Sequence, residues 1–195
     1  MAAPPSFDAA TLARLSELFS RRVAHEIDPG EMRRACVLIP LLEIGGEWGV
    51  LFSHRSPDLP VHSGQISFPG GSAEPGETLE AAALRETEEE IGIPTDAVEL
   101  IGRMDDVITR TGYVVAPFAG VIRRKVPYVL QQSEVTHVYE VPLSVLLDRH
   151  NPEIRYLRYR DRTYPSYFYK HPPIEIWGLT AMMLKRFLDV VRVVL

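Results

Sequence analysis

The chain has 195 residues, of which 46% are hydrophobic, and this is enough for one compact domain with a single core. Its net charge of −5 offers no basic surface of the kind that binds nucleic acid, so we expect no nucleic-acid partner. No apolar stretch approaches the roughly 18 residues of a membrane span, and the first residues lack the pattern of a secretory signal. We therefore expect a soluble cytoplasmic protein with no membrane contact.

Hydrophobic periodicity and turn residues predict helices and strands in alternation, without internal repeats. In chain order we expect a helix over 7–23, a turn at 28–30, strands over 35–42 and 48–54 joined by a glycine turn at 45–46, an extended loop over 56–68, a turn at 70–71, a helix over 78–91, strands over 98–103, 114–122 and 137–141, a short helix over 143–147, a hairpin over 156–169 and a closing helix over 180–195. This order suits an α/β/α sandwich around a mixed β-sheet.

Three further expectations concern domain organisation and packing. Residues 1–30 are expected to form a helical extension packed on a domain that spans 31–195. Cys36 is the only cysteine and lies in an apolar run, so it predicts a buried structural thiol and no disulfide. An apolar stripe in the last helix is expected to belong to the core; the alternative is a homodimer face. The stripe comprises Met182, Leu184, Phe187, Leu188 and Val191.

The helix over 78–91 carries the candidate chemistry. It contains no Gly or Pro, and it places Glu86 and Glu90 one turn apart with Glu89 beside them. Like charges at this spacing repel, and a hard divalent cation such as magnesium would offset the repulsion. Gly71 can supply a carbonyl ligand. Glu77 at the start of the helix could reach back to the loop or to Arg85, and we interpret that pair as scaffolding.

A solvated acidic face is the alternative for such a charge run. The full pattern argues against it, because the spacing of glycine, glutamate and arginine strongly resembles the Nudix box. The matching positions are Gly71, Glu77, Arg85, Glu86, Glu89, Glu90 and Gly92. The one departure is Thr87, where the family usually carries an aliphatic residue, and a slightly weaker core contact is expected there.

The resemblance implies a Nudix fold and hydrolysis of a pyrophosphate linkage with Mg²⁺ or Mn²⁺. Glu86 and Glu90, helped by Glu89 and the Gly71 carbonyl, would hold the metal, and Arg85 would orient the glutamates. The metal would lower the pKa of a bound water. Glu89 and Glu134 both remain candidates for the base that takes its proton.

The segment before the box is similar to the signature of coenzyme A pyrophosphatases within this superfamily. The residues that match, and that would bind substrate, are Arg55, Ser56, Gly64, Phe68 and Gly70. Arginine binds phosphate bidentately, which suits Arg55 for an anionic substrate. Pro60 departs from the signature, which usually has a second arginine there, and nearby His62 could substitute for it in part.

Downstream segments are also similar to that subfamily, among them 111–113 and 176–181. For Trp177 we expect core packing rather than substrate contact. The implied substrate is coenzyme A or a thioester of it, a small molecule. Two alternatives stay open: a Nudix enzyme for ADP-ribose or dinucleotides such as NADH, and a non-catalytic nucleotide-binding module. The second usually loses glutamates from the box, and this chain keeps all of them.

Overall fold

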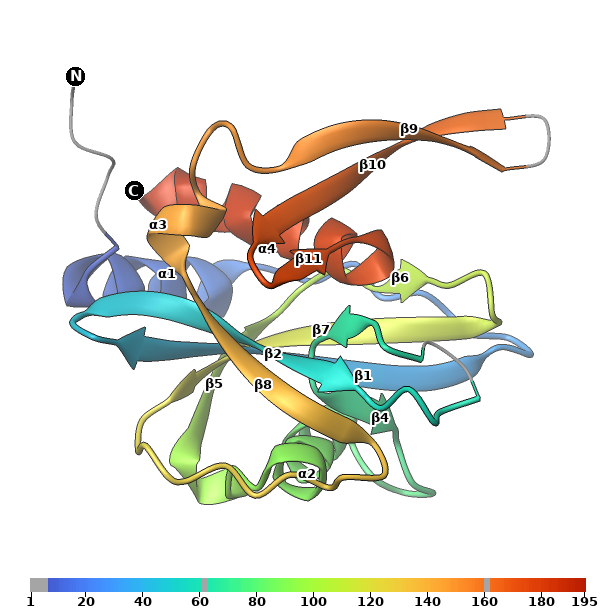
Figure 1. Cartoon of the computed structure of the whole chain (residues 1–195). Helices are drawn as coiled ribbons and strands as arrows, with labels where there is room; N and C mark the ends of the chain where they lie inside the picture. The colour runs from blue at the N-terminus through green and yellow to red at the C-terminus, as the bar shows by residue number, and fades with distance from the viewer. Residues whose placement is uncertain (1–6, 61–62, 160–161) are drawn as a thin grey trace.

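The computed structural model describes residues 7–60, 63–159 and 162–195, and Figure 1 shows the arrangement of their elements. Strand β1 (Arg33–Ile44) lies at the centre of a mixed sheet, because it pairs in parallel with β7 (Tyr113–Ile122) and antiparallel with β2 (Glu47–Arg55) and β4 (Gly70–Ser72). The remaining strands of this sheet are β3 (Ile66–Ser67), β5 (Val98–Arg103), β6 (Val107–Ile108) and β8 (Val135–Pro142).

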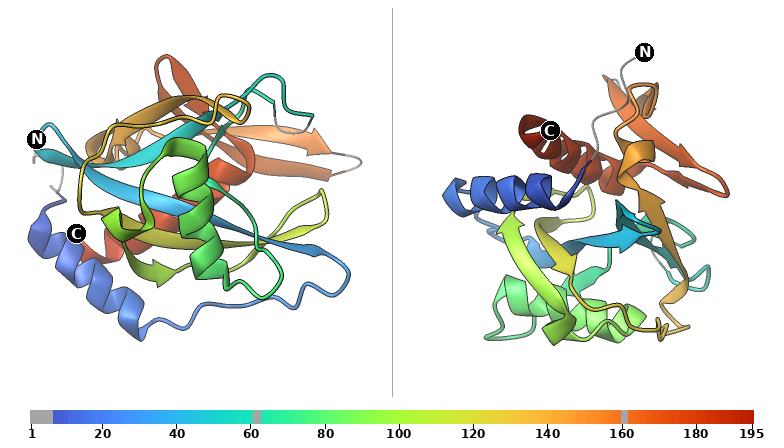
Figure 2. Two further views of the ribbon diagram at one scale, coloured as in Figure 1. Left: turned by 90° about the horizontal axis from the view of Figure 1, so that it is seen from below. Right: turned by 90° about the vertical axis from the view of Figure 1, so that its left-hand side faces the viewer.

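Helices cover both faces of the sheet, as the right-hand view of Figure 2 shows. Helix α2 (Leu79–Ile91) lies on one face, and α1 (Ala9–Arg21) and α4 (Gly178–Val194) lie on the other. Side chains of a strand alternate between the faces. Accordingly, Leu38 of β1 packs in the cluster under α2, and the adjacent Ile39 joins the cluster under α1 and α4. This is the expected α/β/α sandwich around a mixed sheet.

The closing helix α4 uses its apolar stripe for the core, as expected. Leu184, Phe187, Leu188 and Val191 are fully buried, and Met182 packs against them. Helix α1 joins the same core through Leu15 and Phe19. No helix within 7–60, 63–159 and 162–195 is long and apolar enough to cross a membrane.

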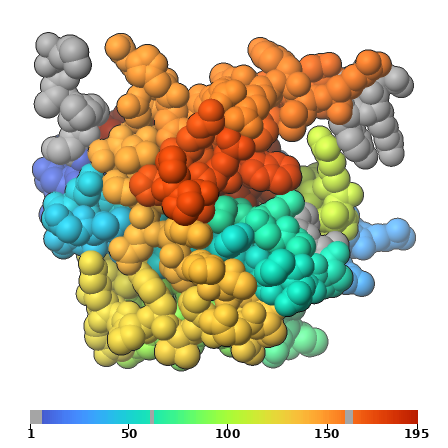
Figure 3. Space-filling model, viewed as in Figure 1, coloured from blue at the N-terminus to red at the C-terminus, as the bar shows by residue number. Residues whose placement is uncertain are grey.

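A small second sheet lies beside α4. It consists of β9 (Glu153–Tyr159), β10 (Arg162–His171) and β11 (Ile174–Ile176), and short helix α3 (Leu143–Leu146) precedes it. Strand β11 contacts β3 of the main sheet, and in the space-filling view the segment around β3, in teal, lies directly below β11 (Figure 3). The second sheet therefore lies against the β3 edge of the main sheet.

The predicted elements are confirmed with shifts of a few residues at their ends, but four short strands were missed. Strands β3 and β4 occupy the regions expected to be a loop and a turn, and β6 and β11 were not expected at all. Each has only two or three residues, which is too short for alternation to be recognised in the sequence. Gly70 and Gly71 pair with Val37 and Cys36 of β1, so hydrogen bonding to a neighbouring strand determines their conformation.

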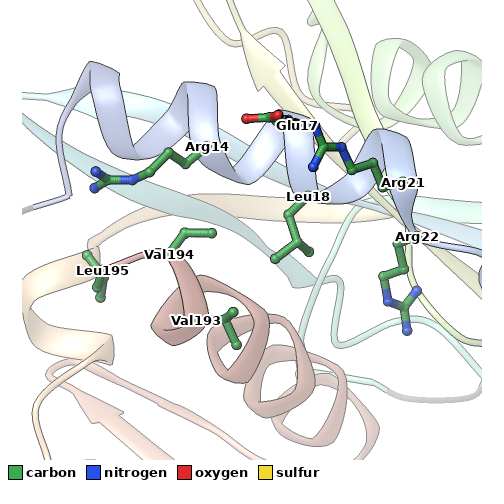
Figure 4. A pocket seen from close by; sticks show the side chains of 8 residues that line it. All are labelled: Arg14, Glu17, Leu18, Arg21, Arg22, Val193, Val194 and Leu195. Carbon is green, nitrogen blue, oxygen red and sulfur yellow. Dashed lines mark hydrogen bonds and ion pairs between the residues drawn. The ribbon is translucent and has the colours of Figure 1, made fainter.

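A hollow of about 690 Å³ lies between α1 and the end of α4, on the face of the sheet away from α2. Figure 4 shows Leu18 and Val194 in the space between the two helices, with three arginines along α1 and just beyond it: Arg14, Arg21 and Arg22. Arg21 pairs with Glu17, and Arg22 pairs with Asp105. This hollow is separate from the acidic helix.

Candidate active site

Local signals place the acidic helix. The Thr78 side chain caps its first turn by accepting a hydrogen bond from the Ala81 N–H at 3.2 Å. Gly92 ends it with φ of 75°, a left-handed conformation that favours glycine. Thr87, the departure from the box pattern, is fully buried and donates its hydroxyl to the Ala83 carbonyl at 2.7 Å. The hydroxyl is therefore satisfied, and the helix keeps its contact with the sheet.

Arg85 organises the acidic side chains around it. Its guanidinium binds both carboxylate oxygens of Glu77, at 2.9 Å and 3.1 Å, which confirms the expected pair. It also binds Glu86 at 3.1 Å, Glu89 at 2.9 Å and the Ser72 carbonyl at 3.1 Å. The hydrogen bond from Arg85 lowers the pKa of Glu77 and so keeps that carboxylate charged. One cation thus joins the loop, the start of α2 and its acidic face.

Glu90 is the most buried carboxylate of the group, with 3% of the residue exposed. Burial raises its pKa to about 8, although Arg55 and the Gly70 N–H oppose that rise. The Gly70 N–H donates to Glu90 Oε2 at 3.3 Å, and Arg55 Nη1 lies 3.9 Å from Oε1. A buried carboxylate with so few partners gains from any cation that reaches it.

Glu86 lies against β4. A Cβ atom on Gly71 would lie 2.4 Å from the carboxylate carbon of Glu86, so only glycine leaves room for this arrangement. Burial raises the pKa of Glu86, Arg85 opposes the rise, and the charges of Glu89 and Glu134 add to it. The Gly71 carbonyl accepts the Cys36 thiol at 3.6 Å.

Glu134 approaches the same carboxylates from a loop far along the chain. The loop before β8 is tied to the end of α2, because the Gln131 N–H donates to the Glu90 carbonyl at 3.0 Å. The Glu134 carbonyl accepts the Ser56 N–H at 2.7 Å. Its negative charge raises the pKa of both Glu86 and Glu90. The structure thus brings Glu134 near the box glutamates.

The donor set suits a hard divalent cation. Carboxylate and carbonyl oxygens are the ligands that magnesium and manganese prefer. Burial raises the pKa of Cys36 to about 12, so its thiol remains protonated and offers no competing sulfur ligand. Within the described part of the chain, no three Asp, Glu, His or Cys side chains form a ready-made set of metal ligands. Arg85 pairs with both Glu86 and Glu89, and the expected convergence of three carboxylates on one metal position is not found among the described residues.

A cleft of about 570 Å³ opens beside these residues. Arg55 lines it, and the Nε of this side chain is buried and has no hydrogen-bond partner. The walls come from β1, the loop and strands over 65–72, the β6–β7 turn and the start of α4. They include Cys36, Gln65, Phe68, Gly70, Gly71, Thr109, Thr111, Tyr113, Trp177, Gly178 and Thr180.

The residues expected to bind substrate divide into two groups. Arg55, Phe68 and Gly70 line the cleft, whereas Ser56 and Gly64 do not. Ser56 is 1% exposed, and its hydroxyl accepts the Asp58 N–H at 3.3 Å, so it holds the loop in place. The Gly64 carbonyl hydrogen-bonds His54 Nε2 at 3.2 Å. Phe68 is 3% exposed and stacks on Phe52 in the core.

The expected core packing of Trp177 is wrong. Its side chain lines the cleft, and 43% of the residue is exposed. Thr109 and Tyr113 also line the cleft, and sequence reasoning assigned Thr109 no role. Hydrophobic periodicity does not indicate Thr109 and Tyr113, because they lie in a turn and at the end of a strand. For Trp177, the sequence offered one signal, a bulky aromatic residue directly before a helix. Pro60 is exposed in the loop, and His62 lies outside the described residues.

The chain is similar to known proteins over most of its length. A model of the NUDIX domain matches residues 32–162. NudL of Klebsiella pneumoniae (strain 342), described as an uncharacterized Nudix hydrolase, is 39% identical over 156 residues, which cover 78% of this chain and 80% of NudL. NudL of Escherichia coli O7:K1 is 40% identical over 157 residues with the same coverage.

Solved structures show the same fold. The Nudix hydrolase RenU from M. smegmatis superposes with a TM-score of 0.58 at 18% identity, covering 83% of this chain and 87% of RenU. DR0079 from Deinococcus radiodurans gives a TM-score of 0.53 at 16% identity, covering 82% of this chain and 86% of DR0079. The acidic helix and most of the cleft lie within residues 32–162, which the family model matches, whereas Trp177 and the cleft residues of α4 lie beyond them.

Proposed function

We propose, since this chain belongs to the Nudix family of hydrolases, that it hydrolyses the diphosphate linkage of coenzyme A or of an acyl-coenzyme A. One observation carries the choice of substrate. Two of the segments that resemble coenzyme A pyrophosphatases, 55–71 and 176–181, are more than a hundred residues apart, and both contribute residues to one cleft. Shared subfamily features that meet at one site favour a role in substrate recognition.

Arg55 is the proposed partner for the diphosphate. Its side chain reaches the cleft from the end of β2, next to Glu90, and its Nε has no protein partner. The guanidinium of arginine binds phosphate oxygens bidentately, and this is the contact that we propose for Arg55 with the diphosphate. Ser56 and Gly64 would shape the loop that positions Arg55, without touching substrate. Phe68 and Gly70 would form the cleft floor.

Glu86 and Glu90 are the proposed metal ligands, together with the Gly71 carbonyl. A bound Mg²⁺ or Mn²⁺ would polarise the diphosphate and lower the pKa of an attacking water. Arg85 would orient Glu86 from behind through its hydrogen bond. Glu89 is 58% exposed and paired with Arg85, so we assign it a supporting role at the rim.

Glu134 is the proposed general base, in preference to Glu89. Glu89 already accepts a hydrogen bond from the Arg85 guanidinium at 2.9 Å, so one of its carboxylate oxygens is engaged. Glu134 lies close enough to Glu86 and Glu90 to raise the pKa of both. In the reaction, the water oxygen bonds to one phosphorus as the bridging P–O bond breaks, and the water proton passes to Glu134. The products are 3′,5′-ADP and 4′-phosphopantetheine or its acyl derivative.

A mass-spectrometric endpoint assay tests the proposal. Purified protein with Mg²⁺ is offered coenzyme A, acetyl-coenzyme A, ADP-ribose and NADH separately. We expect 3′,5′-ADP from the first two substrates and little cleavage of the others. Faster cleavage of ADP-ribose or NADH would replace the coenzyme A assignment and leave pyrophosphate hydrolysis in place. Binding of nucleotide without cleavage of any of the four would favour a non-catalytic module.

A further inference from the structure

An exposed indole forms one wall of the cleft. Trp177 occupies the position directly before α4, in an extended conformation, and 43% of it is exposed. Exposed aromatic residues also occur in the β9–β10 hairpin, such as Tyr156 of β9, but that residue does not line the cleft. Trp177 therefore differs from them by its place beside the proposed diphosphate site.

The indole is held in a fixed orientation from behind. Its ring stacks on Phe168 of β10, with the ring centroids 6.4 Å apart and the planes 9° from parallel. Phe168 is itself 7% exposed. The Arg155 guanidinium lies 4.0 Å from the Phe168 ring centroid, and Glu175 holds that guanidinium through two hydrogen bonds of 2.8 Å and 3.0 Å. The chain thus orders an aromatic surface before any ligand arrives.

The cleft joins this surface to the phosphate-binding groups. Arg55, Gly70 and Gly71 line the same cleft as Trp177, and its volume of about 570 Å³ is in the range of small-molecule sites. A nucleoside diphosphate substrate has a planar base a short distance from its diphosphate. Planar bases stack on aromatic side chains, whereas the pantetheine arm has no ring to stack.

We propose that Trp177 is the stacking platform for the adenine ring of the substrate. The inference rests on the proposed function insofar as the substrate carries an adenine nucleotide. Phe168 and Arg155 position the indole and do not touch the base. The platform would contribute equally in the ground state and the transition state, so it lowers KM and leaves kcat unchanged.

Tryptophan fluorescence provides a direct test. The chain has two tryptophans, and the other one, Trp48, packs edge-on against Phe7 and does not line the cleft. A Trp48→Phe variant therefore isolates the Trp177 signal. In that variant we expect saturable quenching by 3′,5′-ADP, and no quenching by ribose 5-phosphate or by 4′-phosphopantetheine. Quenching by phosphopantetheine alone would overturn the proposal and assign the indole to the other half of the substrate.

Affinity in matched variants gives a second readout. Calorimetry with 3′,5′-ADP should show about tenfold weaker binding for Trp177→Ala and a change of less than about threefold for Trp177→Phe, which keeps a stacking ring. Circular dichroism checks that both variants are folded. Equal affinity of the wild type and Trp177→Ala would refute the platform.

The two proposals can fail separately. If 3′,5′-ADP quenches Trp177 but coenzyme A is not hydrolysed, the adenine platform stands and the substrate assignment falls. If coenzyme A is hydrolysed with the same KM by Trp177→Ala and the wild type, the substrate assignment stands and the platform falls. This second test compares the steady-state KM for coenzyme A in the wild type and in Trp177→Ala.

Discussion

The carboxylate of Glu86 occupies the space next to Gly71 that a side chain at position 71 would fill. A Cβ atom there would lie 2.4 Å from the Glu86 carboxylate carbon and 2.5 Å from each of its oxygens. The box glycine and the box glutamate are thus coupled sterically, fifteen positions apart in the chain. This contact explains in physical terms why strand β4 requires glycine at position 71.

Gly71→Ala is expected to reduce activity at least tenfold with little loss of stability, because the Glu86 side chain can rotate away from the new methyl group. Gly70→Ala is the matched control. Its Cβ would lie 2.2 Å from the Cys36 carbonyl oxygen, and its φ of 150° disfavours other residues. We expect that variant to lower the melting temperature. Thermal unfolding and turnover measured on both variants separate the two effects, and a stable, active Gly71→Ala enzyme would contradict the steric coupling.

Glu90→Gln should reduce kcat by orders of magnitude, because the amide keeps the size of the side chain and loses the charge of a metal ligand. The fold should persist, since the Gln oxygen can still accept the Gly70 N–H. Glu80→Gln, on the exposed first turn of the same helix, should have no effect. Rates are measured at a series of Mg²⁺ concentrations, and a sample with chelator gives the rate in the absence of metal. Near-normal turnover in Glu90→Gln would remove Glu90 from the metal site.

Glu134→Gln and Glu89→Gln distinguish the two candidate bases. We expect the larger fall in kcat, about a hundredfold or more, for Glu134→Gln, because general-base catalysis contributes about 10²–10⁴-fold. Glu89→Gln should cause a smaller loss through its contact with Arg85. The pH–rate profile of each variant provides the second readout, because only loss of the general base removes the limb of the profile that reports ionisation of that base. The reverse order of effects would assign the base to Glu89.

Arg55→Ala should raise KM for coenzyme A about tenfold, since a charge-assisted hydrogen bond contributes about 1.5–3 kcal/mol. Arg124→Ala is a suitable control, because Arg124 is exposed and pairs with the exposed Asp96 on the surface. Initial rates measured at a series of coenzyme A concentrations give the KM of each variant. An unchanged KM in Arg55→Ala would mean that the substrate does not contact this arginine.

Pro60→Arg restores the residue that the coenzyme A signature usually carries. Pro60 is exposed in the loop that follows Arg55, so a longer side chain fits there without disturbing the core. We expect a lower KM for coenzyme A and no change for ADP-ribose, which lacks the 3′-phosphate. If both KM values stay constant, another cation of the site already performs this function.

Local rules explain why so much of the architecture could be predicted. Helix α2 begins and ends where Thr78 and Gly92 cap it, and β5 has the predicted bounds, because caps and alternation act between near neighbours in the chain. The pairing of Glu77 with Arg85 could likewise be predicted, because the two residues lie eight positions apart in one continuous segment. Burial of Cys36 followed from its apolar run.

The sequence by itself determined the acidic helix, the glycine before it and the family of the chain, because these depend on spacing within one continuous segment. Only the tertiary structure decided that Trp177 faces the cleft and that Ser56 is buried. Each of these depends on segments distant in the chain that meet when the sheet closes. Burial and pairing of a side chain are properties of its neighbours in space, and those neighbours are set by long-range packing rather than by local propensity.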